Sequence, residues 1–198
     1  MSTVSGPPST VELRTVDSGP WTKNMRKIIL SVAITLDGFI EGPKGEYDWC
    51  FTDQDYGMKK FMKGIDAIFY GRKCYEMMMG FDHGGPNPYA KMKHYVFSNS
   101  LKKPYEGTEL ISGDFVTQVK NLQRQSGKDI WLFGGAEITT TFIHNDLVDE
   151  VMLAVHPILL GAGKLLFNNT ENRKHFKLVS SKEYSSGLVM LNYEAIHK

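Results

Sequence analysis

Runs of β-branched and aromatic residues alternate with amphipathic stretches along this chain. Residues 27–33 form a run that is apolar on both faces, which is typical of a strand covered by helices on both sides of a sheet. Similar short apolar runs, each bounded by glycine or polar turn residues, predict more strands. These strands are expected at residues 66–71, 93–100, 107–113 and 128–135.

The stretches between these strands carry apolar residues at helical spacing. Met58, Phe61, Met62 and Ile65 lie on one helical face, with lysines on the other. Asp114 is a candidate N-cap for a third helix. The predicted helices span residues 56–65, 72–80, 114–127 and 136–147, and a turn-rich loop is expected at 81–92.

The C-terminal part changes character. Residues 148–161 predict a strand bent near Pro157, and residues 176–197 predict two alternating strands around the turn at 185–187. Alternating strands and helices followed by strands alone indicate an α/β fold, with a mostly parallel central sheet, flanking helices and an antiparallel C-terminal edge. Residues 1–24, rich in Ser, Thr, Pro and Gly, are expected to be a flexible lead-in to one domain at 25–198.

Composition narrows the classes of function. A formal net charge of +1 gives no whole-protein field for a nucleic acid or a membrane, and no segment is long and apolar enough to span one. Two cysteines are too few for a disulfide framework, which favours the cytoplasm. The six histidines form no metal-binding pattern, so no metal is expected.

Paired glycines stand where the strand at 128–135 meets the following helix. Gly134 and Gly135 either make a tight turn or let a phosphate approach the free N–H groups of the helix. Gly71, Arg72 and Lys73 repeat this layout, and two cations at a helix N-terminus are either solvated charges or partners of an anion.

Further polar groups follow other strands. Ser98 and Asn99 end one strand, and ligands of open α/β sheets gather at the carboxyl ends of strands. Asp37 after the first strand is either a turn residue or a carboxylate of the site. Asp53 and Asp55 are helix-start acids by default, although either could anchor a substrate.

The order of these motifs resembles the dihydrofolate reductase-like superfamily. "ITLDGFI", "YGRKCYE", "FSNS", "IWLFGGAEI" and "LVDEVMLAVHPILLGAGKLLF" are similar to the branch of the riboflavin-biosynthesis reductase C-terminal domain, over roughly residues 25 to 195. The pairing of the last two motifs carries most of this resemblance.

The resemblance implies an NADPH-dependent reductase, most similar to small stand-alone members, that acts as a homodimer formed through the C-terminal strands. It implies that Ala33 contacts the nicotinamide and that Asp37 is the catalytic acid at the mouth of the site. It places Gly71, Arg72, Lys73, Ser98 and Asn99 at the adenosine ribose and its 2′-phosphate. It assigns the pyrophosphate to Gly134, Gly135, Ala136 and Glu137.

The sequence departs from the family pattern on the substrate side. Riboflavin-pathway reductases tend to carry an acid where this chain has Phe133, and no deaminase domain or zinc signature precedes the match. A dihydrofolate reductase offers an acid on its first helix, whereas here the acids lie ahead of it. We therefore expect hydride transfer from NADPH to a small heterocycle, either pterin-like or an aminopyrimidine. A non-catalytic nucleotide-binding or assembly module is the alternative.

Overall fold

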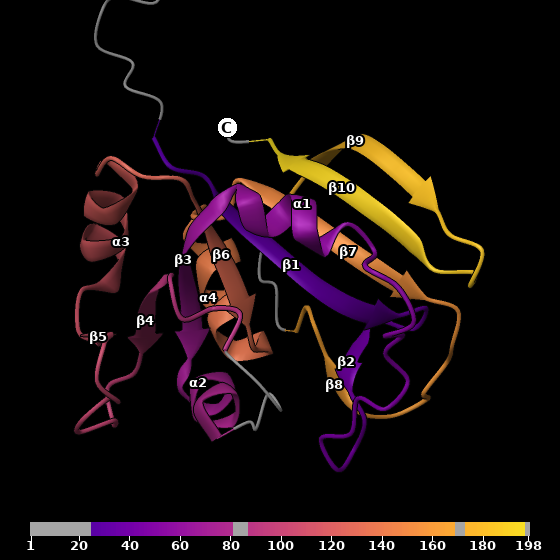
Figure 1. Ribbon diagram of the computed structural model, residues 1–198, viewed down its shortest axis with the longest axis horizontal. Helices are drawn as coiled ribbons and strands as arrows, with labels where there is room; N and C mark the ends of the chain where they lie inside the picture. Colours follow the sequence, from indigo (N-terminus) through magenta and orange to yellow (C-terminus); the bar gives the residue numbers. More distant parts are fainter. Residues whose placement is uncertain (1–24, 81–86, 169–172, 197–198) are drawn as a thin grey trace, which may run out of the picture.

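The structure is a computed structural model, and it describes residues 25–80, 87–168 and 173–196. The predicted lead-in at 1–24 and part of the predicted loop at 81–92 lie outside these residues. Eight of the described strands form one sheet in the order β5-β4-β3-β6-β1-β7-β10-β9 (Figure 1). β2 (Phe39–Glu41) and β8 (Lys164–Leu165) pair separately.

The centre of the sheet is parallel. β1 (Ile28–Thr35) lies between β6 (Asp129–Gly134) and β7 (Glu150–His156), and β3 (Ile65–Gly71) pairs with β6. Beyond β3 follow β4 (Lys93–Phe97) and β5 (Thr108–Ile111), also parallel. Because neighbouring parallel strands end at the same edge, the loops after β3, β4, β5 and β6 are brought together there.

The opposite end of the sheet is antiparallel. β10 (Val189–Ala195) pairs with both β7 and β9 (Phe176–Glu183). β9 and β10 lie at the end of the sheet farthest from β5 (Figure 1). This arrangement confirms the predicted antiparallel C-terminal edge. β9 is largely exposed, including Leu178 and Val179.

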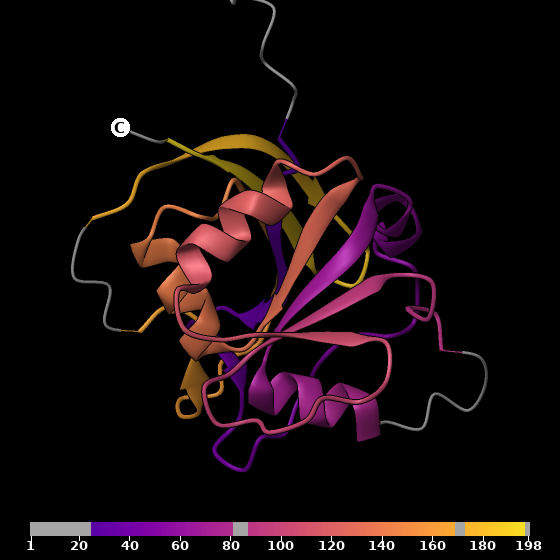
Figure 2. The same cartoon turned by 90° about the vertical axis from the view of Figure 1, so that its left-hand side faces the viewer.

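Helices cover both faces of the parallel part. α3 (Phe115–Gln123) and α4 (Ala136–His144) lie on one side of the strands, and α1 (Met58–Lys63) lies on the other, as Figure 2 shows. α2 (Arg72–Gly80) packs on the same side as α1, since Tyr75 joins the core cluster that contains Phe61.

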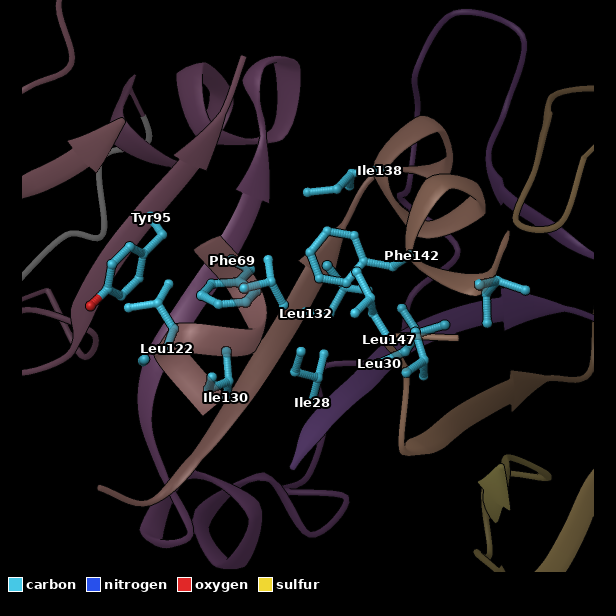
Figure 3. Close-up of a cluster of buried hydrophobic side chains, with 14 of the residues drawn as sticks. Ile28, Leu30, Phe69, Tyr95, Leu122, Ile130, Leu132, Ile138, Phe142 and Leu147 are labelled. Carbon is cyan, nitrogen blue, oxygen red and sulfur yellow. The ribbon is translucent and has the colours of Figure 1, made fainter. Parts of the chain in front are cut away.

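Alternation along each strand divides the core between the two faces. Ile28 and Leu30 of β1 face Phe142 of α4, together with Phe69 and Leu132 of the neighbouring strands (Figure 3). Ile29, Ile68 and Tyr70, each one residue out of step, join the cluster on the other face. All of these side chains are buried, so the two-sided apolar run of β1 is explained by its central place.

Three details of the structure differ from the prediction. β7 ends at His156, so Pro157 terminates this strand and does not bend it, because proline has no N–H for the ladder. α3 and α4 stop at Gln123 and His144, earlier than predicted. The β2–β8 pair was missed because its strands are only three and two residues long and give no periodic signal.

Candidate cofactor groove

A groove of about 470 Å³ lies at the carboxyl ends of β3, β4, β5 and β6. Most of the predicted cofactor residues line it, although they come from three separate segments. They are Gly71, Arg72, Lys73, Ser98, Asn99, Gly135, Ala136 and Glu137. The tertiary structure therefore brings together the three strand ends that the sequence marked as rich in donors.

Ala33 and Gly134 do not line this groove. Ala33 is paired with Ala154 inside the ladder between β1 and β7, and Gly134 is the buried last residue of β6. Gly134 has φ of +109°, which favours glycine, and is joined to Gly135 by a cis peptide bond. The contact of Ala33 with a nicotinamide stays a prediction.

The start of α4 presents backbone N–H groups to the groove. Gly135 is its N-cap and has no side chain to accept from the first turn, while its carbonyl accepts the N–H of Thr139 at 3.0 Å. A Cβ at Gly135 would lie 3.1 Å from Sγ of Cys74, so the backbone runs unusually close to α2. Because the N-cap residue is a glycine, no side chain accepts the free N–H groups of the first turn. These donors and the positive end of the helix dipole favour binding of an anion at this position.

The cations at the start of α2 are held by weak ion pairs. Nη1 of Arg72 lies 3.1 Å from Oε1 of Glu76, and Nζ of Lys73 lies 3.7 Å from Oε1 of Glu137. All four side chains are well exposed, and such pairs contribute about 0–1 kcal/mol. Arg72 and Lys73 can therefore exchange these carboxylates for a phosphate at small cost.

Ser98 and Asn99 shape the neighbouring wall. Oγ of Ser98 accepts the N–H groups of Ser100 and Leu101 at 3.1 and 3.0 Å, which closes a tight turn after β4. Oδ1 of Asn99 accepts the N–H of Gly113 at 3.1 Å and so joins the ends of β4 and β5. Oγ of Ser98 also lies 3.4 Å from Oγ of Ser100, and the side-chain amide of Asn99 offers donor hydrogens to a ligand.

Aromatic side chains form the apolar part of the groove. Phe97, Phe115 and Phe142 line it, with ring centroids 5.2 Å apart for Phe97 and Phe142 and 6.4 Å apart for Phe97 and Phe115. Ile111 and Ile138 lie beside them. Phe142 is fully buried, whereas Phe97 and Phe115 are partly exposed and can contact a flat heterocycle, and the polar wall can hold phosphate groups.

Other lining residues were missed in the sequence. Ser112 and Gly113 follow β5. The rule that ligands gather at the carboxyl ends of parallel strands would have found them if it had been applied to β5 as well. Lys164 lies on β8, and no motif spacing connects it with the helix starts. Only the pairing of β8 with β2 brings it to the groove.

Asp37 lies outside the groove and is fully engaged. Its carboxylate accepts the hydroxyl of Thr35 at 2.6 Å and the N–H groups of Leu160 and Gly161 at 3.0 and 2.7 Å. The Thr35 hydrogen bond, followed by these backbone bonds, lowers the pKa of Asp37. Asp37 is thus ionised at neutral pH and ties the β1–β2 turn to the loop after β7; its catalytic role stays a prediction.

Aromatic residues surround the carboxyl end of β7. The ring of the buried His156 lies 5.2 Å from that of Trp49 and 5.0 Å from that of Phe51. Nδ1 of His156 donates to the carbonyl of Ala154, and Nε2 accepts the N–H of Phe51. Burial lowers the pKa of His156, so the neutral ring is favoured.

The remaining substrate-side candidates are held locally. Phe133 packs between Tyr70 and Trp131, with ring centroids 5.3 and 4.9 Å away. Asp53 accepts the hydroxyl of Tyr56, and Asp55 accepts the N–H of Lys59 in the first turn of α1. Both aspartates therefore have structural partners.

The described residues contain neither a metal-binding cluster nor a membrane-spanning helix. Within residues 25–80, 87–168 and 173–196, no group of three His, Cys, Asp or Glu side chains could hold a metal ion. In the same part of the chain, no helix has the length and apolarity to cross a membrane.

The fold and groove define a mostly parallel α/β protein of the dihydrofolate reductase-like class. Over residues 26–190 the chain matches the family described as the RibD C-terminal domain, and it belongs to that family. It is 41% identical over 177 residues to the uncharacterized protein YyaP of Bacillus subtilis (strain 168), an alignment that covers 85% of this chain and 94% of that protein. For the uncharacterized protein YwjB of the same organism, the identity is 30% over 172 residues, covering 85% and 97%.

Solved structures agree with this class. A putative riboflavin biosynthesis protein from Shewanella sp. PV-4 is similar with a TM-score of 0.76 and 27% identity, covering 86% of this chain and 99% of that one. Dihydrofolate reductase from Enterococcus faecalis, complexed with NADP(H), gives a TM-score of 0.60 and 12% identity, covering 86% and 97%. The latter likeness shows the fold alone.

Proposed function

We propose that this protein is an NADPH-dependent reductase that acts on a small heterocyclic substrate, either a pterin of the dihydrofolate type or an aminopyrimidine of riboflavin biosynthesis. The observation that carries the proposal is the groove, in which the uncapped start of α4 and the cations of α2 meet the donors after β4. Membership of the RibD C-terminal domain family and the likeness to a reductase complexed with NADP(H) support it. Bound NADPH would supply the hydride.

The chain's own residues would bind and orient the cofactor. Gly135, Ala136 and Glu137 would offer backbone N–H groups to the pyrophosphate. Arg72 and Lys73 would hold the 2′-phosphate, since arginine gives a phosphate two parallel hydrogen bonds. Ser98 and Asn99 would donate to the ribose.

Cofactor binding tests the first half of the proposal. Titration of the full chain with NADPH, followed by fluorescence or calorimetry, should give saturable binding that is tighter than for NADH. Binding of neither nucleotide at high micromolar concentration would remove the proposal. Oxidation of NADPH in the presence of dihydrofolate or a ribosylated aminopyrimidine tests the second half.

A non-catalytic nucleotide-binding or assembly module is the second candidate. It is favoured by Phe133, which packs against aromatic rings at a position where riboflavin-pathway reductases tend to carry an acid, and by the fully engaged carboxylate of Asp37. Saturable NADPH binding with no oxidation over a broad panel of pterins and aminopyrimidines would favour this candidate. Steady oxidation with any of them would exclude it.

Assembly and location form part of the same proposal. We propose a homodimer formed through β9 and β10, since β9 is an edge strand with exposed Leu178 and Val179. Light scattering of the full chain measures its mass directly, and a monomer across the micromolar range would contradict the dimer. The cytoplasm is the compartment that we propose, because NADPH-dependent reduction needs a reduced cofactor pool.

A further inference from the structure

Lys164 enters the cofactor groove from a part of the chain that is distant from the glycine motifs. It lies on β8, paired in register with Glu41 of β2. Its Nζ is 3.3 Å from Oε1 of Glu41, and about one third of each side chain is exposed (33% and 38%). The ammonium group is therefore close to a groove wall and is held by one half-exposed carboxylate.

The backbone around Lys164 is fixed from two sides. Gly163 has φ of +142°, and a Cβ there would lie 2.2 Å from the carbonyl oxygen of Glu41, so the loop lies directly against the end of β2. At the other end of the same loop, Asp37 accepts the N–H groups of Leu160 and Gly161. These contacts place Lys164 beside Glu41 without help from a ligand.

Lys164 lines the same groove as the start of α4 and Cys74. The pKa of Cys74 is raised mainly by burial and is lowered by the charge of Lys164, which agrees with this placement. That thiol is itself in close contact with Gly135, the N-cap of α4. Lys164, Cys74 and Gly135 consequently form one continuous part of the groove wall.

We propose that Lys164 binds the diphosphate of the dinucleotide, and that Glu41 occupies it as an internal counter-ion when no dinucleotide is bound. This inference rests on the proposed function, because it concerns the same groove. Replacing Glu41 by a diphosphate costs little free energy, because a half-exposed ion pair contributes little to stability. A diphosphate also carries more charge and more acceptor oxygens than a carboxylate. Lys164 thus supplements the neutral N–H groups of α4 with a full positive charge.

The proposal predicts that substitutions of the two partners of this ion pair change the affinity for the dinucleotide in opposite directions. Lys164→Ala removes the cation and weakens binding, whereas Glu41→Gln removes the competing anion and strengthens it. An ion pair with only a structural role would give losses from both changes. Lys174 and Asp146, an ion pair at 2.6 Å with 23% and 62% of the two side chains exposed, do not line the groove and provide matched controls.

The experiment is calorimetric titration of the full chain and of four variants, Lys164→Ala, Glu41→Gln, Lys174→Ala and Asp146→Asn. The ligands are NADPH, NADH and inorganic pyrophosphate, at low and high salt. We expect Lys164→Ala to weaken all three ligands about tenfold at low salt, and less at high salt. We expect Glu41→Gln to tighten them about two- to fivefold, and the control variants to bind as the wild type does.

Three results would overturn the proposal while the proposed function stands. The first is wild-type affinity for NADPH in Lys164→Ala. The second is a loss of affinity in Lys164→Ala for NADPH but not for NADH, and the third is weaker binding of the ligands in Glu41→Gln. The second result would assign Lys164 to the 2′-phosphate. If the wild type binds pyrophosphate through Lys164 but binds neither nucleotide, the proposed function fails and the anion contact stands. Equal melting temperatures of the variants confirm that each loss reflects binding.

Discussion

The groove after β3 to β6 and the region around the carboxyl ends of β1 and β7 belong to one sheet edge but are built differently. In the groove, the charged side chains are held by exposed ion pairs such as Arg72 with Glu76, and α4 begins without a side-chain cap. Around β1 and β7, the polar groups are satisfied internally, as Asp37 and His156 show. The first region can exchange its partners for a ligand, whereas the second maintains its own shape.

One side chain departs from this contrast. Trp49 is buried against His156, and its Nε1 group has no hydrogen-bond partner in the part of the chain that the structure describes. A buried donor without a partner is uncommon. The region around β1 and β7 therefore contains one buried donor that has no acceptor within the described residues.

The largest expected effect comes from adding a side chain at Gly135, where we propose that the backbone contacts the pyrophosphate. Gly135→Val should weaken NADPH binding at least about 100-fold, because a side chain keeps a phosphate away from at least two charge-assisted hydrogen bonds. Calorimetry measures this loss. Gly80→Val, at a glycine with no atom within 4 Å of an added Cβ, is the control and should bind normally.

A second variant separates cofactor contact from packing. A Cβ at Gly135 also approaches Sγ of Cys74, so Gly135→Val with Cys74→Ala should recover stability but not affinity for NADPH. If the double variant regained wild-type affinity, the loss would come from the displaced helix α2, and the pyrophosphate assignment would be withdrawn.

Arg72 should give the next largest effect. Arg72→Ala is expected to weaken NADPH about 10- to 100-fold and NADH at most about threefold, because only NADPH has a 2′-phosphate for the guanidinium group. Binding constants for both nucleotides decide this point. Arg124→Ala, an exposed arginine after α3, serves as the control, and equal losses for the two nucleotides would contradict the assignment.

The free energy of unfolding should depend on pH through the region around β1 and β7. His156 has a lowered pKa in the folded state, so the unfolded chain binds the proton more tightly. Stability contributed by the neutral ring is present above the unfolded pKa of about 6.5 and is lost as the pH falls below it. Melting temperatures between pH 8 and pH 5, on the order of one reading per half unit, should fall less in His156→Gln than in the wild type.

His94 provides the comparison for that measurement, since burial also lowers its pKa. His94→Gln should remove the contribution of His94 to the pH dependence of the melting temperature and leave the contribution of His156 unchanged. A wild-type pH profile in His156→Gln would show that this ring is not the source. NADPH binding by His156→Gln at neutral pH should be unchanged, because the ring does not line the groove.

The smallest effect is expected at Phe133. Phe133→Leu should lower the free energy of unfolding by about 1 kcal/mol, through lost packing on Tyr70 and Trp131, with NADPH affinity unchanged within about twofold. Denaturant unfolding and calorimetry measure the two quantities. A tenfold loss of NADPH affinity would mean that the core cluster around Trp131, on the other face of the sheet from α4, is coupled to the groove.

Local signals account for much of what the sequence predicted correctly. The two-sided run of β1, the Asp114 N-cap and the glycine between β6 and α4 each depend on neighbours in the chain, and the structure shows all three. Asp114 accepts the N–H of Thr117, as expected of an N-cap. The family membership and the mostly parallel sheet with its antiparallel edge were also predicted and are confirmed.

Other features depend on residues that are far apart in the chain. No local pattern connects Lys164 with Glu41, which are joined by a two-residue strand and by Gly163. Two of the partners of Asp37, the N–H groups of Leu160 and Gly161, lie more than 120 residues away, so the sequence left open whether this residue makes a turn or a site. The ends of β7, α3 and α4 were placed late because tertiary packing, and not periodicity, decides where an element stops.

The sequence by itself determined the order of the helices and of the eight strands of the main sheet, the glycines at their junctions and the cations beside them, because each depends on a few consecutive residues. Only the tertiary structure decided which of these junctions share a groove. Parallel pairing of β3, β4, β5 and β6 collects their carboxyl ends, and the β2–β8 pair adds Lys164 to that wall. The physical reason is that strand pairing and side-chain packing join residues by distance in space, which no single stretch of sequence records.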